Sequence, residues 1–309
     1  MSRGEDLRTT ADALDGSIAV CGLGHMRAQL SAESFREARV VSVSDLLDGR
    51  SGTGATAVDS TDTAELDDST VATEAVAAVV LVDPTAGEDV LADLRAVADT
   101  EVFTVAVVAG DDIDSDALAT ITAAVDGVLL VGDGTDSTLG PIEAVQEFLA
   151  VVRDPGFINL DLTDARTVLA SGPAAVATGS APPDAPELAV KSAFDRLPSG
   201  VDAASASAVL VDVVVDTDTS ITAATAVVDE VRDRIATDAN VIWGGAVDDD
   251  TTDGLFTRVV VADVRYDPPL AAGDPCPRCG SSLSAYTFGA SETLSCDACG
   301  YSGIGMRRR

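Results

Sequence analysis

Two pairs of cysteines near the C-terminus have the spacing of a metal site. Each pair separates two thiols by two residues, in Cys276-Pro277-Arg278-Cys279 and in Cys296-Asp297-Ala298-Cys299, and a glycine follows each pair. One tight turn can then present both sulfurs, because the glycine permits a positive φ. Tetrahedral zinc takes four thiolates at about 2.3 Å, which leaves no open position. We therefore predict a structural zinc site with these ligands: Cys276, Cys279, Cys296 and Cys299. Two disulfides are the alternative, although an intracellular chain favours metal.

A glycine-rich turn near the N-terminus has the context of a phosphate-binding site. Gly22-Leu23-Gly24 follows a strand candidate and opens a helical pattern. Glycines at such a place let backbone amides approach phosphate oxygens. Arg27 replaces the third glycine of the usual pattern, so an ordinary strand-to-helix turn is the alternative. His25, the single histidine, lies beside the turn without an accompanying cysteine or serine constellation, and we assign it no catalytic role.

A short loop later in the chain gathers one amide and two carboxylates. Asp154-Pro155-Gly156 ends a helical pattern at residues 142–152, because Pro and Gly interrupt helices. Asn159, Asp161 and Asp164 follow on the loop. Their role can be structural, with Asn159 and Asp161 bonding the loop backbone and Asp164 capping the next helix. The residue types alone leave a functional role open beside this one.

The first half of the chain alternates short valine-rich runs with helical patterns, which predicts βαβ units and a parallel sheet covered on both faces. The strand candidates are residues 18–21, 40–43, 79–82, 102–108 and 128–131, and the helical patterns are residues 26–38, 88–99 and 115–124. Residues 49–69 are polar without an apolar period and are expected to form a loop.

A second α/β unit follows the helix at residues 142–152. Its strand candidates are residues 174–178, 206–215, 240–246 and 256–264, and its helical patterns are residues 188–196 and 224–235. Pro268-Pro269 and Gly273 mark a linker to the cysteine-rich module. We therefore divide the chain into a nucleotide-binding-like domain (1–135), a central helix (136–154), a smaller α+β domain (155–267) and a zinc ribbon (274–303).

The charge balance of the chain is strongly acidic. It has 52 acidic residues against 19 basic ones, a net charge of -33. Self-repulsion of this size strains a compact domain, but at about 1 M salt the Debye length falls to roughly 3 Å. We interpret the composition as adaptation to a salt-loaded cytoplasm, with an acidic surface for a basic partner as the alternative. Binding of nucleic acid by the body is not expected.

Two further classes of function are limited by composition. No apolar run reaches the ~20 residues of a membrane span, and no secretory h-region is evident, so we expect a cytoplasmic protein without membrane insertion. Residues 271–309 differ from the body, since they carry four arginines against three acids. Contact with nucleic acid or with an acidic partner is therefore considered only for the ribbon.

The order of these segments resembles the FtsZ family of tubulin-like GTPases. The resemblance covers roughly residues 17–266, is faint in the first half, and rests on residues 155–168, 174–179 and 203–246. Asn240-Val241-Ile242-Trp243-Gly244 is similar to the family's late "N-I-I-F-G" strand. Gly22 and Gly24 lie where the family has its first glycine-rich loop. The resemblance implies a Rossmann-like N-terminal parallel sheet, a central helix and a smaller C-terminal domain.

The resemblance also implies a role for the polar loop. In the family this loop enters the nucleotide pocket of the adjoining subunit, where its carboxylates position the attacking water or a cation. Asn159, Asp161 and Asp164 stand at the family's three polar positions. Asp164 is then the main candidate for positioning water, with Asp161 assisting.

The departures from the family pattern fall on the chain's own nucleotide pocket. The family has the glycine run GGGTGTG after a middle strand, whereas here residues 79–82 are followed by Asp83-Pro84-Thr85-Ala86-Gly87-Glu88-Asp89. Pro84 has no amide to donate, and three acids repel phosphate. We find no guanine-reading group near Ser137-Thr138, although Asp136 is close. We therefore expect binding of GTP to be weak or lost, and no intrinsic GTPase activity.

Our leading hypothesis is a regulator or partner of a GTP-bound FtsZ filament in cell division or the cytoskeleton. Such a chain polymerises poorly and offers its acidic loop to an FtsZ-family protein, which places it in the cytoplasm and at the division site. One alternative is a divergent GTPase whose remodelled pocket still uses Gly22 and Gly24. The other is an adaptor whose ribbon binds nucleic acid or protein.

Overall fold

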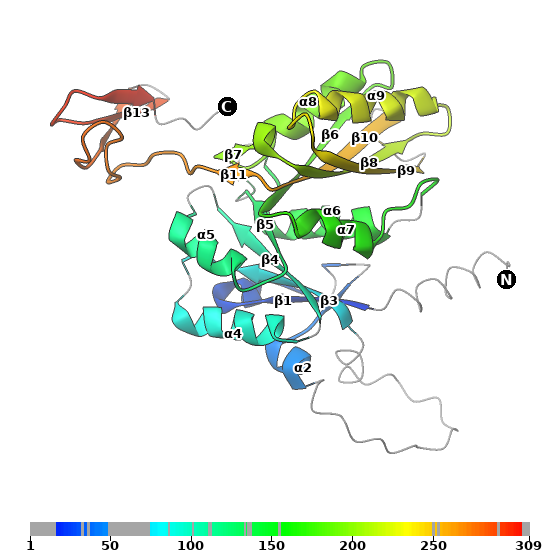
Figure 1. Cartoon of the computed structure of the whole chain (residues 1–309), viewed down its shortest axis with the longest axis horizontal. Helices are drawn as coiled ribbons and strands as arrows, with labels where there is room; N and C mark the ends of the chain where they lie inside the picture. Colours follow the sequence, from blue (N-terminus) through cyan, green and yellow to red (C-terminus); the bar gives the residue numbers. More distant parts are fainter. Residues whose placement is uncertain are drawn as a thin grey trace.

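The computed structural model describes most of the chain (Figure 1). The described residues are 17–31, 34–35, 38–48, 75–85, 87–100, 102–110, 113–132, 134, 138–153, 156–248, 251, 254–288 and 291–304. Several sequence-based expectations lie outside them: the loop at residues 49–69, Asp136 and Ser137 of the guanine region, and the terminal arginines.

One nine-stranded sheet runs through both predicted α/β units, in the order β2-β1-β3-β4-β5-β6-β10-β8-β9. Its strands are β1 Ser17–Gly22, β2 Arg39–Val40, β3 Ala75–Val82, β4 Phe103–Ala109, β5 Gly127–Val131, β6 Ala174–Ala181, β8 Ala208–Val215, β9 Asn240–Val247 and β10 Leu255–Ala262. The strands from β2 to β6 are parallel, and β10 is antiparallel to both of its neighbours. The expected parallel sheet is therefore present. It joins the second unit through two residue pairs, Leu129 with Ala174 and Leu130 with Ala175.

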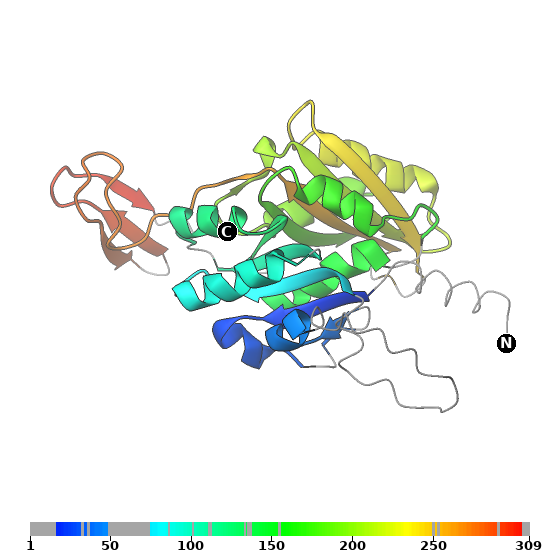
Figure 2. The same ribbon diagram turned by 60° about the horizontal axis from the view of Figure 1, so that its bottom comes forward.

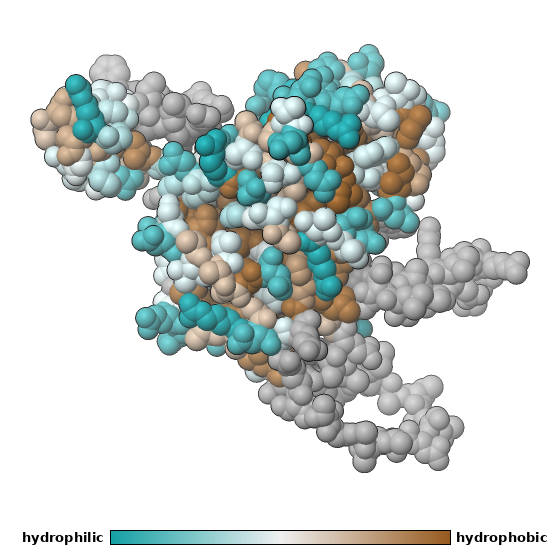
Figure 3. All heavy atoms as spheres, in the orientation of Figure 1, coloured by the Kyte–Doolittle hydropathy of each residue, from teal (hydrophilic) through white to brown (hydrophobic). Residues whose placement is uncertain are grey.

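Helices cover both faces of this sheet. One face carries α2 Val43–Asp48, α4 Glu88–Ala98, α5 Ser115–Thr122, α8 Pro186–Asp195 and α9 Ile221–Arg232. The opposite face carries α6 Pro141–Arg153 and α7 Leu162–Leu169. Strand β3 shows why its valine-rich sequence suits this position, since Val80 faces the first core and Val79 the second. Hydrophilic residues cover the outer side of α4, whose inner side is buried (Figure 3).

Two predictions near the N-terminus were wrong. The helix predicted over residues 26–38 is a short 3-10 helix, η1 Gly24–Gln29, and the described residues from Leu30 to Ala38 are not helical. Side-chain bonds compete with the helix there, because Ser34 Oγ accepts from the backbone N–H of Ser31 at 3.2 Å.

The second error concerns the strand predicted over residues 40–43. Strand β2 ends at Val40, and helix α2 begins at Val43. A reciprocal pair of bonds starts the helix: Ser42 Oγ accepts from Asp45 N–H at 3.1 Å, and Asp45 Oδ2 accepts from Ser42 N–H at 3.3 Å. This is a capping box, which overrides the β-branched sequence around it.

The cysteine-rich module forms a separate small sheet of β12 Ser284–Phe288, β13 Ser291–Ser295 and β14 Ser302–Ile304. Its buried core is small: Cys276, Leu283, Leu294 and Cys296. The module projects from the body in both views (Figures 1 and 2). Among the described residues, no helix has the length and apolar character to cross a membrane.

Candidate metal centre and polar loop

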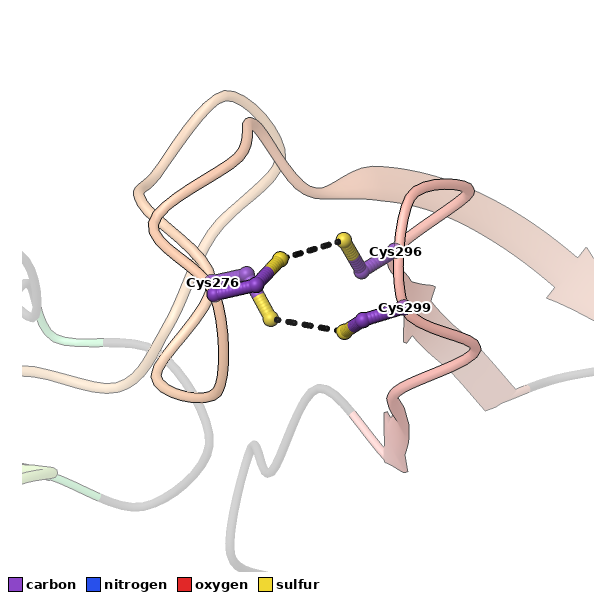
Figure 4. A group of neighbouring side chains, drawn as sticks. Cys276, Cys296 and Cys299 are labelled. Carbon is purple, nitrogen blue, oxygen red and sulfur yellow. Dashed lines mark hydrogen bonds between the residues drawn. The ribbon is translucent and has the colours of Figure 1, made fainter.

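The structure brings the four predicted ligand cysteines of the ribbon together. Their sulfur atoms all lie within 4.8 Å of one another, with 3.7 Å between Cys276 Sγ and Cys299 Sγ and 3.5 Å between Cys279 Sγ and Cys296 Sγ (Figure 4). A disulfide requires about 2.05 Å between sulfurs. Four thiolates around zinc at about 2.3 Å lie about 3.8 Å apart, which is the spacing observed. The donor set therefore fits a closed tetrahedral ion.

Local interactions shift the pKa values of two of these thiols in opposite directions. The backbone and side chain of Ser281 hydrogen-bond to Cys279 and, with the neighbouring thiols, lower its pKa to about 6. The bond from Tyr301 N–H acts to lower the pKa of Cys299, but burial and the neighbouring thiols outweigh it and raise that pKa to about 12. Both groups bind metal in their thiolate form. Cys21 is separate from this site, and burial within β1 raises its pKa to about 12 even though Arg27 acts against this. Cys21 is therefore a core residue of the main sheet.

The three polar residues of the loop after α6 all bond to nearby backbone. Asn159 Oδ1 accepts from Gly156 N–H at 2.7 Å. Asp161 Oδ1 caps α7 by accepting from Thr163 N–H at 2.7 Å and from Asp164 N–H at 3.0 Å. Asp164 Oδ2 accepts from Asp161 N–H at 3.0 Å, which completes a capping box. The cap is therefore Asp161, whereas the structural alternative had assigned this role to Asp164.

The bonds to backbone fix the two carboxylates without using all of their oxygens. Asp161 Oδ2 and Asp164 Oδ1 accept no hydrogen bond from another described residue. Asp161 is exposed and Asp164 is half-buried. Each rotamer is held by one oxygen, and the other oxygen is available to a water molecule, a cation or a partner.

The polar loop packs closely against two glycines of the edge strand β9, Gly244 and Gly245, which together form the seat of the loop. Ile158 forms an antiparallel bridge with Gly245, with N···O distances of 3.2 and 2.9 Å. A Cβ on Gly245 would lie 2.5 Å from the ring of Phe157, and one on Gly244 would lie 2.7 Å from Leu160. These glycines belong to the strand on which the family resemblance rests, so the resemblance has a physical basis in the loop's seat.

Replacing one of these glycines should displace the loop. We expect Gly244→Ala to destabilise the protein by about 1–3 kcal/mol, because the added methyl group would lie 2.8 Å from the backbone oxygen of Ile158 and 2.7 Å from the buried side chain of Leu160. Urea denaturation measures the loss. Gly87→Ala is the matched control, since a Cβ there meets nothing within 4 Å and φ is -71°. Equal stability of the two variants would contradict the seat as described.

The glycine turn after β1 is closed by its own backbone bonds. Leu23 N–H donates to Leu81 O at 2.9 Å, and Met26 N–H donates to Leu23 O at 3.1 Å. Gly22 is required because η1 packs against it, where a Cβ would lie 2.7 Å from Arg27 N. Gly24 has a φ of +58°. The two glycines thus serve a tight turn, and two of the amides near a phosphate position are already engaged.

A carboxylate occupies the connection after β3, beside this turn. Asp83 Oδ1 accepts from Thr85 N–H and Oγ1, both at 2.8 Å, and Asp83 Oδ2 lies 2.7 Å from His25 Nδ1. Burial raises the pKa of Asp83, but the bonds from Thr85 and the proximity of His25 outweigh it and hold the pKa below its usual value. The pairing of His25 with Asp83 was not foreseen from the sequence. A fixed negative charge here opposes a phosphate ligand.

An ion cluster between α6 and the second half of the sheet was also missed. Arg258 on β10 binds Glu147 of α6 at 2.6 Å and Asp212 of β8 at 2.8 Å. Burial alone would lower the pKa of Arg258, and the two carboxylates raise it above its ordinary value. Charged residues scattered over three elements give no local signal, so sequence reasoning had no way to pair them.

Comparison with known proteins identifies the class of the second half of the chain. A family model described as "FtsZ family, C-terminal domain" matches residues 172–265. The cell division protein FtsZ of Haloferax mediterranei is 36% identical over 127 residues, which are 40% of this chain and 33% of that protein. FtsZ 1 of Halobacterium salinarum is 36% identical over 125 residues, 40% of this chain and 32% of that protein. Both organisms are halophilic archaea. The chain thus matches about a third of the length of these relatives.

Solved structures extend the likeness to the whole fold. The FtsZ dimer of M. jannaschii, described as empty, superposes with a TM-score of 0.60 at 17% identity, covering 89% of this chain and all of that one. A GTPγS-bound protofilament of CetZ2 from Haloferax volcanii gives a TM-score of 0.54 at 16% identity, covering 86% of this chain and 89% of that one. The fold is therefore that of the tubulin-like proteins. Within that fold, residues 172–265 match the C-terminal domain of the FtsZ family, and the remainder of the body is similar to FtsZ and CetZ in fold.

Proposed function

We propose that this chain regulates a GTP-bound FtsZ-family filament in cell division or the cytoskeleton and polymerises poorly itself. The observation that carries the proposal is the contrast between its two ends. At one end, hydrogen bonds with the backbone fix the side chains of Asp161 and Asp164, and each carboxylate has a second oxygen that accepts no bond from a described residue. At the other, Asp83 and Pro84 occupy the place of a phosphate-binding run.

The chemistry at the loop end follows from the free carboxylate oxygens. A partner that holds GTP at its own surface would place the γ-phosphate against this loop. Asp164 would accept a hydrogen bond from the attacking water, and Asp161 would orient that water or a cation beside it. Catalysis of phosphoryl transfer depends mainly on such positioning and on electrostatic stabilisation. Docking could therefore change GTP turnover as well as growth of the filament.

Apolar side chains beside the loop strengthen this choice of face. Phe157 is 44% exposed, Ile158 38% and Val247 51%, and all three lie at or beside the edge strand β9. Large apolar side chains held rigidly at a surface are typical centres of protein interfaces. They supply contact area that the acidic residues do not.

The test is to titrate the protein into polymerising Haloferax mediterranei FtsZ with GTP at high salt. We expect the wild-type chain to change GTP turnover and filament assembly, and Asp164→Ala and Asp161→Ala to lose most of that effect. No change with the wild-type protein would refute the proposal. Calorimetry with GTP and magnesium serves as a second readout, because micromolar affinity would support a divergent GTPase instead.

A matched control separates the loop's chemistry from helix capping. Loss of an N-cap costs about 1 kcal/mol of stability in either helix. Asp114 caps α5 as Asp161 caps α7, by accepting from Asp116 N–H at 3.0 Å and Ala117 N–H at 2.9 Å. Asp114→Ala should therefore lower stability as Asp161→Ala does, while keeping the effect on the filament. An equal loss of effect in both variants would assign it to stability.

A further inference from the structure

The ribbon is anchored at the carboxyl-end edge of the parallel strands. Strand β11 Arg265–Tyr266, which precedes the linker, pairs with β7 Val201–Asp202. Tyr266 Oη accepts a hydrogen bond from the backbone N–H of Ile113 at 3.1 Å. Ile113 lies in the connection that follows the carboxyl end of β4. The chain therefore leaves the body at the edge that also carries Asp83 and the glycine turn.

The spacer between this anchor and the ribbon is short and stiff. The last backbone bond to the body, among the described residues, is from Asp267 N–H to Gly200 O at 2.9 Å. The first bond within the ribbon is from Ala271 N–H to Asp274 Oδ2 at 2.7 Å. Only Pro268-Pro269-Leu270 lies between them. Three residues in an extended proline conformation span about 9 Å, so the ribbon stays close to its anchor.

The direction of the projection places the ribbon opposite the acidic loop. In both views it lies beyond the outer ends of α4 and α5, whereas the passage from α6 to α7 is at the other end of the body (Figures 1 and 2). That passage contains Asn159 and Asp161. A subunit that stacked on the carboxyl-end edge would have to occupy the space that the ribbon fills.

We infer that the ribbon is a steric terminator that prevents the addition of a further subunit at the carboxyl-end edge. The inference rests on the proposed function, in which the loop end holds the filament. The connection after β3, with Asp83 and Pro84, weakens the binding of nucleotide at the carboxyl-end edge. The ribbon fills the space that a further subunit would need at the same edge. The two effects are independent, because the obstruction depends on the spacer and on zinc rather than on any nucleotide.

A longer spacer tests the inference in the full-length protein. A flexible Gly/Ser insert of about 15 residues between Pro269 and Leu270 allows the ribbon to move about 20 Å from its anchor. We expect this variant to keep its zinc and its co-sedimentation with Haloferax mediterranei FtsZ filaments. The concentration needed to shorten filaments, measured by electron microscopy, should rise several-fold.

Tyr286→Ala is the matched control, because Tyr286 is 52% exposed on the ribbon and its loss leaves the spacer unchanged. Its potency should equal that of the wild type if the ribbon obstructs, and should fall if the ribbon acts by recognising a partner, which would overturn the inference. Unchanged potency of the insert variant would also overturn it. If the wild-type chain fails to bind filaments, the proposed function falls together with the inference.

Discussion

Removal of zinc is expected to unfold the ribbon and leave the body folded. Among the ribbon residues whose burial is described, four form the buried core, and two of these, Cys276 and Cys296, are ligands, which leaves Leu283 and Leu294 as its apolar part. A core of that size cannot offset the conformational entropy of ordering the module. Structural zinc supplies about 10–16 kcal/mol in small domains of this kind, and that free energy is folding free energy.

The measurements are metal content and amide hydrogen exchange. One zinc per chain should be present before treatment with a chelator, and the amide protons of β12, β13 and β14 should lose protection afterwards. Cys296→Ser should behave like the chelated protein at ordinary zinc concentrations. Cys21→Ala is the control, since Cys21 lies in the core of the main sheet and should not alter the metal content. Protection of the ribbon that survives complete chelation would contradict a structural metal.

Loss of Arg258 is expected to be the most destabilising charge change in the body. Its side chain is 14% exposed and faces Glu147 and Asp212, of which Asp212 is 9% exposed. Removing one partner of a buried ion pair costs about 3–5 kcal/mol, because the remaining charge stays desolvated. Arg258→Met keeps much of the side-chain volume, so its effect isolates the charge. Urea unfolding followed by circular dichroism gives the change in free energy.

Arg265→Met provides the comparison at the surface. Arg265 pairs with Asp202 at 2.6 Å, but the two side chains are 79% and 41% exposed. Exposed pairs contribute about 0–1 kcal/mol, and salt weakens them further. Similar losses for the two variants would show that burial does not control the strength of the Arg258 cluster. Asp212→Asn should recover part of the stability lost in Arg258→Met, because it removes one of the two charges left behind.

Several of the strands that the sequence predicted, among them β3, β4 and β8, are buried along almost their whole length. Val79 to Val82 is apolar on both faces, which only a covered strand permits, and the pattern was therefore unambiguous. The cysteine site was predictable for a different reason: the two-residue spacing within each cysteine pair is enough to place both sulfurs on one tight turn. The helix predicted over residues 26–38 was wrong although a helical period is present there. Bonds between Ser31 and Ser34 and the closed glycine turn determine the local conformation instead.

The glycine contacts of the polar loop and the Arg258 cluster escaped prediction because they depend on contacts between distant segments. The sequence around Gly245 does not indicate why a glycine is needed in this strand. The reason is the ring of Phe157, which lies against it and is 88 positions earlier in the chain. Arg258 meets Glu147 and Asp212 through three different elements. The domain boundaries and the roles of Asn159, Asp161 and Asp164 remain predictions, because geometry alone does not report what a partner would touch.

The shared sheet has a mechanical consequence. The two halves of the body are joined edge to edge by the pairing of β5 with β6, which involves two residue pairs, whereas β8 and β9 share eight. Bending the molecule along its length would concentrate strain at this narrow seam. Two contacts outside the sheet also join the halves, Arg258 with Glu147 and Tyr266 with Ile113, so they would share the load on this seam.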